Sequence, residues 1–272
     1  MPELPEVETV RRSLLATEGQ TLQQVKVVDG RLRYPVRAAQ FTDLAGRVLQ
    51  KIDRAGKYLV FNFSAEAGEP GVMVIHLGMT GRLLLNAAKN AYSKVEFIFS
   101  RDRLVYIDVR RFGFILTGQK AVHALPAGID ALAKDITKAG ERILRSRSPI
   151  KNVLLDQKIL SGIGNIYASE ILFSAGVNPT RMASGLSDGE LKRIFTATRK
   201  VLQKAIEAKG SSISDFVYAL PGEEKFSTGY YQKQFLVYSR EGEKCRRCSA
   251  TINKIMQSNR ATYFCPNCQK LE

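Results

Sequence analysis

The N-terminus places a secondary amine beside a carboxylate. The chain begins Met1-Pro2-Glu3, and removal of methionine before a small residue would leave Pro2 with a free α-amine. Since such an amine has a pKa of about 7.7–8.0, roughly a tenth to a third of it is unprotonated near neutral pH and able to attack carbon. Attack on a sugar carbon would give a cationic iminium, which is an electron sink, while the Glu3 carboxylate could move protons beside it. These residues alone are equally compatible with an ordinary N-terminus that enters a helix.

Composition points to a polyanionic partner. The chain has 272 residues, of which 44% are hydrophobic, and 41 Lys and Arg against 26 Asp and Glu give a formal net charge of +15. The length allows two domains with cores of their own. Because such an excess of charge repels itself in the folded state, nucleic acid is the first candidate partner and a membrane surface the second. No basic amphipathic helix, long apolar segment or signal peptide is evident, so we expect no membrane partner.

All four cysteines lie near the C-terminus in two Cys-x2-Cys pairs, Cys245 with Cys248 and Cys265 with Cys268. This spacing is typical of a four-thiolate structural zinc site, which leaves no open metal position for catalysis. Two disulfides are the alternative, which the missing secretory signal disfavours. Residues 251–255 and 262–264 suggest two strands with a basic tip at 257–260, a hairpin suited to touching DNA.

Five segments in order along the chain resemble the formamidopyrimidine-DNA glycosylase family of bacteria: Pro2–Thr9, Lys57–Leu59, His76–Gly81, Arg110–Gly113 and Gly162–Glu170. The resemblance implies an α+β fold of two domains, an N-terminal β-sandwich with an N-terminal helix and a C-terminal helical domain with a helix-two-turn-helix element and a zinc β-hairpin. We expect the sandwich at 2–130, the helical part at 131–238 and the zinc finger at 239–272, with DNA between the two halves.

Hydrophobic periodicity predicts the elements of this architecture. Short strand-like runs separated by turn residues predict a sandwich, and longer stretches at helical spacing follow from about residue 131. The expected helices are about 5–17, 152–160, 166–175, 187–208 and 212–219, with Ser187 and Glu190 forming a capping box. The expected strands are 25–28, 58–63, 72–77, 95–99, 104–109 and 114–117.

The resemblance also implies an activity, that of a bifunctional glycosylase and apurinic/apyrimidinic lyase in base excision repair. It would excise oxidised purines, chiefly 8-oxoguanine and formamidopyrimidines, through a covalent intermediate on Pro2 followed by β- and δ-elimination. Glu3 would manage protons, Lys57 would assist β-elimination, and Arg260 would grip the phosphate beside the lesion for δ-elimination. By position alone, Lys57 reads as a solvated strand-edge lysine. Glu6 matches an acidic residue at the lesion, although a role at the helix start explains it almost as well.

An enzyme that works on a base inside a duplex must swing the nucleotide out and fill the gap. The resemblance assigns that work to Met79, Arg110 and Phe112, each of which could otherwise be a core or surface residue. Met79 lies in the segment 76–81, and Arg110 and Phe112 lie in the segment 110–113. Both segments are glycine-flanked turns that follow expected strands, and side chains in such turns point out of a sandwich rather than into its core.

Further DNA contacts are expected in the second half of the chain. The glycine-rich run before Asn165 would present backbone N–H groups to a phosphate at a helix start. Arg147 and Lys151 would add phosphate contacts, and Tyr238 matches a tyrosine that touches DNA in the family.

Two departures and two rivals stand beside these matches. The family commonly has a histidine pair at the start of the strand before the Arg-Phe motif, but this chain has no histidine at 90–96, so that contact is missing or has passed to Tyr92 or Lys94. Residues 217–231 cannot be matched residue by residue. An endonuclease VIII-like enzyme for oxidised pyrimidines and a non-catalytic zinc-ribbon DNA-binding protein are the alternatives. We expect a monomer that acts on damaged double-stranded DNA in the bacterial cytoplasm, with one structural Zn²⁺.

Overall fold

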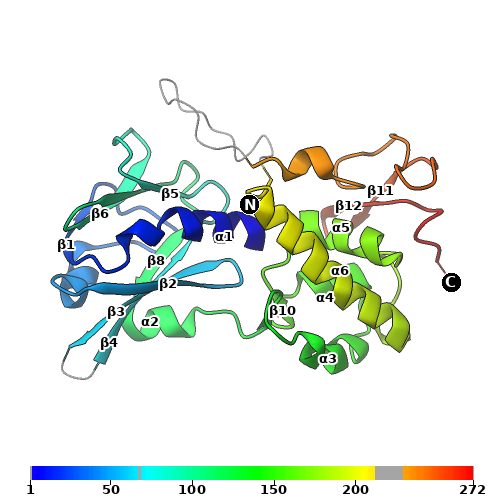
Figure 1. Ribbon diagram of the computed structural model, residues 1–272, viewed down its shortest axis with the longest axis horizontal. Helices are drawn as coiled ribbons and strands as arrows, with labels where there is room; N and C mark the ends of the chain where they lie inside the picture. The colour runs from blue at the N-terminus through cyan, green and yellow to red at the C-terminus, as the bar shows by residue number, and fades with distance from the viewer. Residues whose placement is uncertain (1, 67–68, 212–228, 272) are drawn as a thin grey trace. The chain divides into compact units, whose positions relative to one another are not determined.

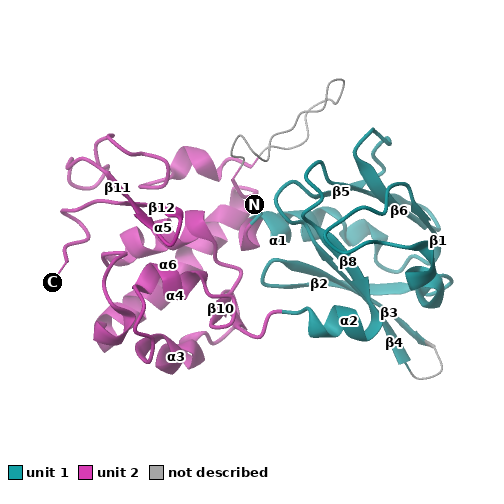
Figure 2. Ribbon diagram, turned by 180° about the vertical axis from the view of Figure 1, so that it is seen from behind, with its two compact units in different colours: residues 1–2, 6–125, 213–226 teal, residues 3–5, 126–212, 227–272 magenta. Residues whose placement is uncertain are grey.

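The computed structural model describes residues 2–66, 69–211 and 229–271. The chain divides into two compact units, coloured separately in Figure 2. Unit 1 covers, among the described residues, 2 and 6–125, and unit 2 covers 3–5, 126–211 and 229–271. The predicted helix at 212–219 and most of the unmatched segment 217–231 lie outside the described residues.

Unit 1 is built on two four-stranded antiparallel sheets, ordered β1-β6-β7-β5 and β2-β3-β4-β8, seen edge on in Figure 1. The predicted β-sandwich is confirmed. The first sheet consists of β1 (Leu22–Val27), β5 (Arg82–Leu85), β6 (Ser93–Phe99) and β7 (Arg103–Ile107). The second consists of β2 (Leu49–Ala55), β3 (Tyr58–Glu66), β4 (Glu69–His76) and β8 (Phe114–Thr117).

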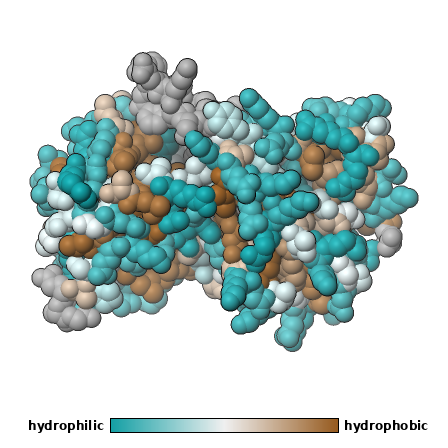
Figure 3. Space-filling model, viewed as in Figure 1, coloured by the Kyte–Doolittle hydropathy of each residue, from teal (hydrophilic) through white to brown (hydrophobic). Residues whose placement is uncertain are grey.

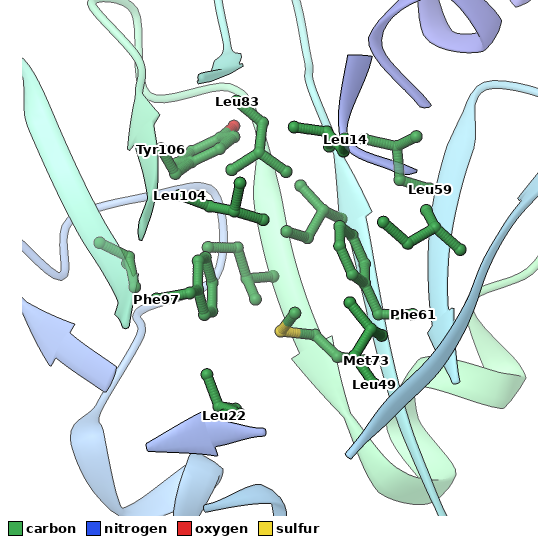
Figure 4. Packing of buried hydrophobic residues seen from close by; sticks show 14 of the residues in the cluster. Leu14, Leu22, Leu49, Leu59, Phe61, Met73, Leu83, Phe97, Leu104 and Tyr106 are labelled. Carbon is green, nitrogen blue, oxygen red and sulfur yellow. The ribbon is translucent and has the colours of Figure 1, made fainter. Parts of the chain in front are cut away.

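Apolar side chains from both sheets form the core of unit 1. Phe61 and Met73 on one sheet, and Phe97 and Leu104 on the other, are buried in one cluster, and Figure 4 shows these side chains pointing toward one another. Every second residue of these strands enters the cluster, for example Val95, Phe97 and Phe99 of β6, as expected for strands that turn one face toward a core.

Two strands of the sandwich escaped the sequence patterns. In β2 only Leu49 and Ile52 are buried, so its polar residues hide the alternation that marks a half-buried strand. The short β5 has only four residues, too few for a period to be visible.

Helix α1 (Leu4–Ser13) begins the chain, and a 3₁₀ turn, η1 (Leu15–Thr17), follows it. The predicted helix at 5–17 is therefore right in place, but its last turn is tighter than an α-helix. Two further elements border the sandwich: η2 (Ala38–Leu44) and α2 (Gly118–His123).

Unit 2 is mainly helical. Its elements in chain order are β9 (Ile129–Asp130), η3 (Thr137–Ala139), α3 (Gly140–Leu144), α4 (Ile150–Leu155), β10 (Leu160–Ser161), α5 (Asn165–Ala175), η4 (Ala183–Gly185), α6 (Asp188–Glu207) and η5 (Tyr231–Gln234). Helix α5 is buried along nearly its whole length and packs against α6, α4 and the C-terminal hairpin. The predicted capping box of α6 is confirmed, because Ser187 and Glu190 exchange side-chain bonds with each other's backbone N–H.

The predicted helix at 152–160 is too long. Helix α4 ends at Leu155 because the Asp156 carboxylate accepts the N–H of Lys158 at 2.9 Å, a local turn that competes with helix. Leu160 then pairs in parallel with Ile129.

The hairpin near the C-terminus consists of β11 (Asn253–Gln257) and β12 (Arg260–Phe264). Gln257 pairs with Arg260, so Ser258 and Asn259 alone form the turn, both with positive φ (47° and 59°), as a type I′ turn requires. No helix among the described residues is both long and apolar enough to cross a membrane. Hydrophilic residues cover most of the face shown in Figure 3, with smaller hydrophobic areas between them.

Candidate functional site

The Glu3 carboxylate caps helix α5 within unit 2. One oxygen accepts the N–H of Ile166 at 2.9 Å, and the other accepts the N–H of Gly164 at 2.8 Å and of Tyr167 at 3.3 Å. A negative group is favoured there by unsatisfied N–H groups and by the helix dipole. Glu3 is 3% exposed, so its carboxylate is held in one orientation directly after Pro2.

The glycine-rich turn before α5 is shaped to receive this N-terminal segment. A Cβ on Gly164 would clash with the Glu3 carboxyl group, and one on Gly162, whose φ is +105°, would clash with Leu4. Leu4 also donates its N–H to the Gly162 carbonyl at 3.0 Å. The expectation that these N–H groups hold a phosphate is wrong for Gly164, Ile166 and Tyr167, because Glu3 already accepts from them.

Lys57 lies in the tight turn between β2 and β3. Ala55 pairs with Tyr58, and Gly56 at the first turn position has φ of +59°, a conformation that glycine adopts without a Cβ clash. Lys57 is 5% exposed, so it is not the solvated strand-edge lysine that its position alone suggests.

His76 is a site residue that the sequence analysis did not single out. Its pKa is lowered to about 4, first by burial and then by the charges of Lys57 and Arg33, so the ring is neutral at physiological pH. Its Nδ1 accepts the N–H of Gly78 at 3.1 Å, which leaves the ring proton on Nε2. The signal available in the sequence was that His76 is the first residue of the segment His76–Gly81, which also contains Met79.

Two loops of unit 1 carry Met79 and the Arg110–Phe112 pair. The hydroxyl of Thr80 donates to Asp108 at 2.6 Å and accepts the N–H of Arg110 at 3.0 Å. Asp108 also accepts the N–H of Gly113 at 2.9 Å. Asp108 and Thr80, which the sequence analysis did not select, therefore join the loops.

The loops also approach each other through glycines. A Cβ on Gly78 would come within 2.5 Å of the backbone of Phe112 and Gly113, and one on Gly113 would overlap the Tyr106 hydroxyl. At the outer end, the Arg110 guanidinium lies 4.8 Å from the centre of the Phe112 ring, which is 47% exposed. Met79, which lies between Gly78 and Thr80 in the other loop, is half-buried. The three side chains assigned to fill the DNA gap thus stand on two mutually fixed loops.

The structure distinguishes Tyr92 and Lys94, the two candidates for the contact that a histidine makes in the family. Lys94 is 2% exposed and its ammonium lies 2.7 Å from Asp29, which also lies 3.5 Å from a nitrogen of Arg111. Tyr92 is 40% exposed, and its carbonyl accepts the N–H of Asp108 at 3.2 Å. Lys94 supports the Arg110–Phe112 loop from inside, and Tyr92 is the one with an exposed side chain.

Arg260 stands exposed at the start of β12, on the hairpin tip. The carbonyl of the next residue, Ala261, accepts from Lys151 Nζ at 3.1 Å and from Asn165 Nδ2 at 2.9 Å. Lys151 is fully buried, so its predicted phosphate contact is not available in this structure. The amide nitrogen of Asn165 is likewise occupied by the Ala261 carbonyl. Its Oδ1 is buried and has no hydrogen-bond partner in the described part of the chain.

The remaining predicted residues differ in accessibility. Arg147 is exposed, whereas Glu6 is 6% exposed within unit 1. Tyr238 lies in a segment whose N–H groups, at residues 236–238, donate to the buried Glu170 carboxylate at 2.8–3.1 Å. Its ring also packs edge-on against Tyr263 of the hairpin at 5.1 Å. Glu170 thereby fixes the segment that leads into the hairpin.

The four cysteines form a group that fits zinc. Their sulfur atoms all lie within 4.8 Å of one another, with Cys245 to Cys268 at 3.9 Å and Cys248 to Cys265 at 3.4 Å. A tetrahedral site with Zn–S bonds of about 2.3 Å places sulfurs about 3.8 Å apart. The donor set and its spacing match a closed structural zinc site.

Family models match most of the chain. Residues 1–115 match the formamidopyrimidine-DNA glycosylase N-terminal domain, 127–217 its H2TH domain, and 242–271 a zinc finger found in FPG and IleRS. Proteins named formamidopyrimidine-DNA glycosylase from Thiobacillus denitrificans and Burkholderia mallei are 39% and 40% identical over 99% of this chain and 100% of their own length.

Solved structures agree with these matches. A mutant of the Lactococcus lactis FPG in complex with Fapy-dG DNA has a TM-score of 0.84 at 33% identity, covering 99% of this chain and 100% of that one. MutM (FPG) from Thermus thermophilus has a TM-score of 0.83 at 35% identity, covering 98% of each chain.

Proposed function

The chain belongs to the formamidopyrimidine-DNA glycosylase family, and from that premise we propose that it excises oxidised purines from double-stranded DNA and then cleaves the backbone. The observation that carries this is the Glu3 carboxylate, held by three backbone N–H groups directly after Pro2. A fixed proton-transfer group next to an N-terminal secondary amine suits covalent catalysis at a sugar carbon.

In the first step the Pro2 nitrogen, after removal of Met1, forms a bond to C1′ while the glycosidic bond breaks. The base leaves with the bonding electrons and takes up a proton. Glu3 serves the proton transfers at the sugar as its ring opens, and the product is an iminium between Pro2 and C1′. Because its oxygens are anchored by backbone groups, the carboxylate needs little reorganisation during the reaction.

The iminium makes the C2′ proton acidic. Its removal breaks the C3′–O bond in β-elimination, and a second elimination breaks the C5′–O bond. We assign assistance of the first to Lys57 and the phosphate contact of the second to Arg260, whose exposed guanidinium is shaped for bidentate binding of phosphate. Neutral His76, with its proton on Nε2, can donate a hydrogen bond beside Lys57.

Damaged duplex DNA is the proposed partner, as it is in the complexes of the Lactococcus lactis relatives. Met79, Arg110 and Phe112 fill the gap left by the flipped nucleotide, with Tyr92 as an added contact in place of the family's histidine. Arg147, Asn165 and Tyr238 remain proposed DNA contacts, and Glu6 a proposed lesion-site residue.

Zinc bound by the four cysteines would have a structural role: it would keep the hairpin that carries Arg260 folded. We further propose domains at 2–130, 131–238 and 239–272, a monomer, and a bacterial cytoplasmic location, the last because thiolates persist in a reducing compartment.

Borohydride trapping tests the proposal. Protein whose loss of Met1 is verified by intact mass is mixed with duplexes that contain 8-oxoguanine, an abasic site or an oxidised pyrimidine, and reduced during turnover. We expect a covalent adduct with the 8-oxoguanine and abasic duplexes, strongly weakened in Pro2→Gly. No adduct on any duplex would overturn the assignment, and an adduct on the pyrimidine duplex alone would favour the endonuclease VIII-like alternative.

A further inference from the structure

Helix α6 presents a basic face that the proposed chemistry does not use. Its buried stripe, which includes Ile194 and Leu202, packs against the unit interior. After Asp188 and Gly189 in the first turn, its exposed residues are Lys192, Arg193, Thr196, Arg199, Lys200, Gln203, Lys204 and Glu207, which together are called the exposed stripe. Helix α6 packs against α5 through its buried stripe. Arg193 is the member of the exposed stripe that reaches α5, where it donates to the carbonyl of Ala175 at the C-terminal end of that helix, opposite the helix start that binds Glu3.

A groove runs along this stripe. It has a volume of about 560 Å³ and lies between α6 and residues 134–137. The guanidinium of Arg199 bridges its two sides by donating to the carbonyls of Ala133 and Lys134 at 2.9 and 3.0 Å. The groove is thus a built feature of unit 2 and does not depend on a single loose side chain.

The charge along the groove is mainly positive and unneutralised. Lys134, Arg199, Lys200 and Lys204 line it, against Asp135 and Glu207. Asp135 is turned into its own loop, where it accepts from the N–H and the hydroxyl of Thr137. In the described ranges no ion pair involves Lys134, Lys200 or Lys204. Such an arrangement costs self-repulsion unless an anion binds there.

The spacing fits a phosphate backbone. Lys192, Lys200 and Lys204 lie on one side of the helix, and twelve residues at 1.5 Å per residue span about 18 Å. One DNA strand carries a charge every 3.4 Å or so along the axis, so about five phosphates lie within that span. The groove floor offers only half-buried Phe195 and buried Ile136 as apolar groups, which is little for an anchoring side chain of an acidic protein. Repeated charge without a deep pocket favours DNA over such a protein.

We propose that the outer face of α6 is a second, non-specific binding site for duplex DNA, separate from the lesion site, through which the enzyme passes from one duplex segment to another. The inference rests on the proposed function only in that the lesion site binds DNA. A second duplex held at α6 raises the local concentration of the next segment while the first dissociates.

The test follows release from a lesion duplex. A complex with a fluorescent duplex that carries a tetrahydrofuran abasic analogue is challenged at low ionic strength with rising concentrations of unlabelled, lesion-free duplex. The dissociation rate of the native enzyme should rise with competitor concentration, because transfer proceeds through a doubly bound state. In the double variant Lys200→Ser/Lys204→Ser the dissociation rate should no longer depend on competitor concentration. The slope of the logarithm of the binding constant against the logarithm of salt concentration, for lesion-free duplex at this site, should become shallower by about 2.

The matched control is Lys26→Ser/Lys120→Ser, which removes the same charge from exposed positions of unit 1. It should keep the competitor dependence of the native enzyme. A native rate that does not depend on competitor, an unchanged rate in the α6 variant, or equal loss in the control would overturn the second site. Borohydride trapping of the α6 variant should equal that of the native enzyme, and a loss there would place these lysines in the lesion site and also overturn the proposal.

Discussion

The ammonium group of Lys151 on α4 lies 2.6 Å from Oγ1 of Thr262 on β12. The same nitrogen donates to the carbonyl of Ala261, the residue after Arg260. Burial, and then the nearby charge of Arg260, lower the pKa of Lys151 to about 8, while Glu3 acts in the opposite direction. A lysine that reads as a phosphate contact in the sequence thus supports the strand that presents Arg260.

Lys151→Met tests this support. Methionine keeps much of the buried volume but donates no hydrogen bond, so the hairpin should lose about 1–3 kcal/mol of attachment to α4. We expect retained zinc, β-elimination close to normal and a smaller share of δ-elimination product, measured on an abasic duplex by gel. Arg147→Met removes an exposed charge at a proposed DNA contact and is the comparison: it should weaken DNA binding without changing the ratio of the two elimination products. Uniformly weakened DNA binding with an unchanged product ratio would instead make Lys151 a phosphate contact.

Thr80→Val should loosen the two loops that carry Met79, Arg110 and Phe112. The variant keeps the side-chain shape, but the buried Asp108 carboxylate loses its 2.6 Å donor and the Arg110 N–H its acceptor, a cost of about 1.5–3 kcal/mol. Excision from a duplex should slow, whereas cleavage of a single-stranded abasic site, which needs no gap filling, should change little. Thr80→Ser keeps the hydroxyl and should behave as the native enzyme does. Equal slowing on both substrates would argue for general unfolding instead.

Local motifs made much of the fold and site predictable. The strand predicted at 95–99, with apolar residues at 95, 97 and 99, depends on neighbouring residues, as do the capping box at Ser187 and Glu190 and the cysteine spacing. The Glu3 carboxylate, by contrast, binds N–H groups 161 to 164 residues away. No periodicity encodes such a contact, which is why those N–H groups were assigned to a phosphate.

The same limit explains the other differences. Lys94 and Asp29 are 65 residues apart, so the sequence could not show that Lys94 is buried while Tyr92 is exposed. The end of α4 depends on a single Asp156 side chain, whose turn competes with an otherwise helical pattern. Pairwise tertiary contacts and side-chain turns are what pattern reasoning misses.

Glu8 should make unit 1 sensitive to acid. Burial alone would raise the pKa of Glu8, but hydrogen bonds from Arg11 and Arg12 outweigh it and lower the pKa to about 2. A folded-state pKa below the ordinary 4.5 means that the stabilisation is present above pH 4.5 and is lost as pH falls from 4.5 toward 2. The Glu8 side chain is buried, but Arg12 is 58% exposed and solvent screens its charge, so we expect Glu8→Gln to cost about 1–2 kcal/mol at pH 7.

Urea unfolding of both proteins across pH checks this. The difference in unfolding free energy should be constant above pH 5 or so and shrink toward zero near pH 2. Glu141→Gln, which removes an ion pair with both partners 80% exposed, should change little at any pH. A Glu8→Gln difference that does not depend on pH would exclude the charge as its cause.

Cys265→Ser should release zinc and unfold the hairpin, since so small an element has little core of its own. Duplex binding should weaken on every sequence, because phosphate contacts carry charge and no base identity, while the sandwich keeps its thermal transition. Arg260→Ala should retain one zinc per chain yet lose δ-elimination, with a shallower salt dependence. Metal analysis decides the point: reduced, metal-replete protein with far less than one zinc per chain would remove the assignment.

Glu3→Gln separates chemistry from structure at the N-terminus. Both Glu3 oxygens accept backbone N–H groups, and a glutamine would turn its own NH₂ toward one of these donors, which costs about 1–3 kcal/mol of unit 2 stability. Base excision in a single turnover should also fall by about 10²–10⁴-fold, the usual contribution of positioned proton transfer. DNA affinity should change little. Glu3→Asp keeps the charge on a shorter stem and serves as the control for lost capping. If Glu3→Asp slows excision as much as Glu3→Gln, with the same loss of stability, the role of Glu3 is to hold the N-terminus. If Glu3→Gln excises within a few-fold of the native rate, Glu3 does not transfer the proton.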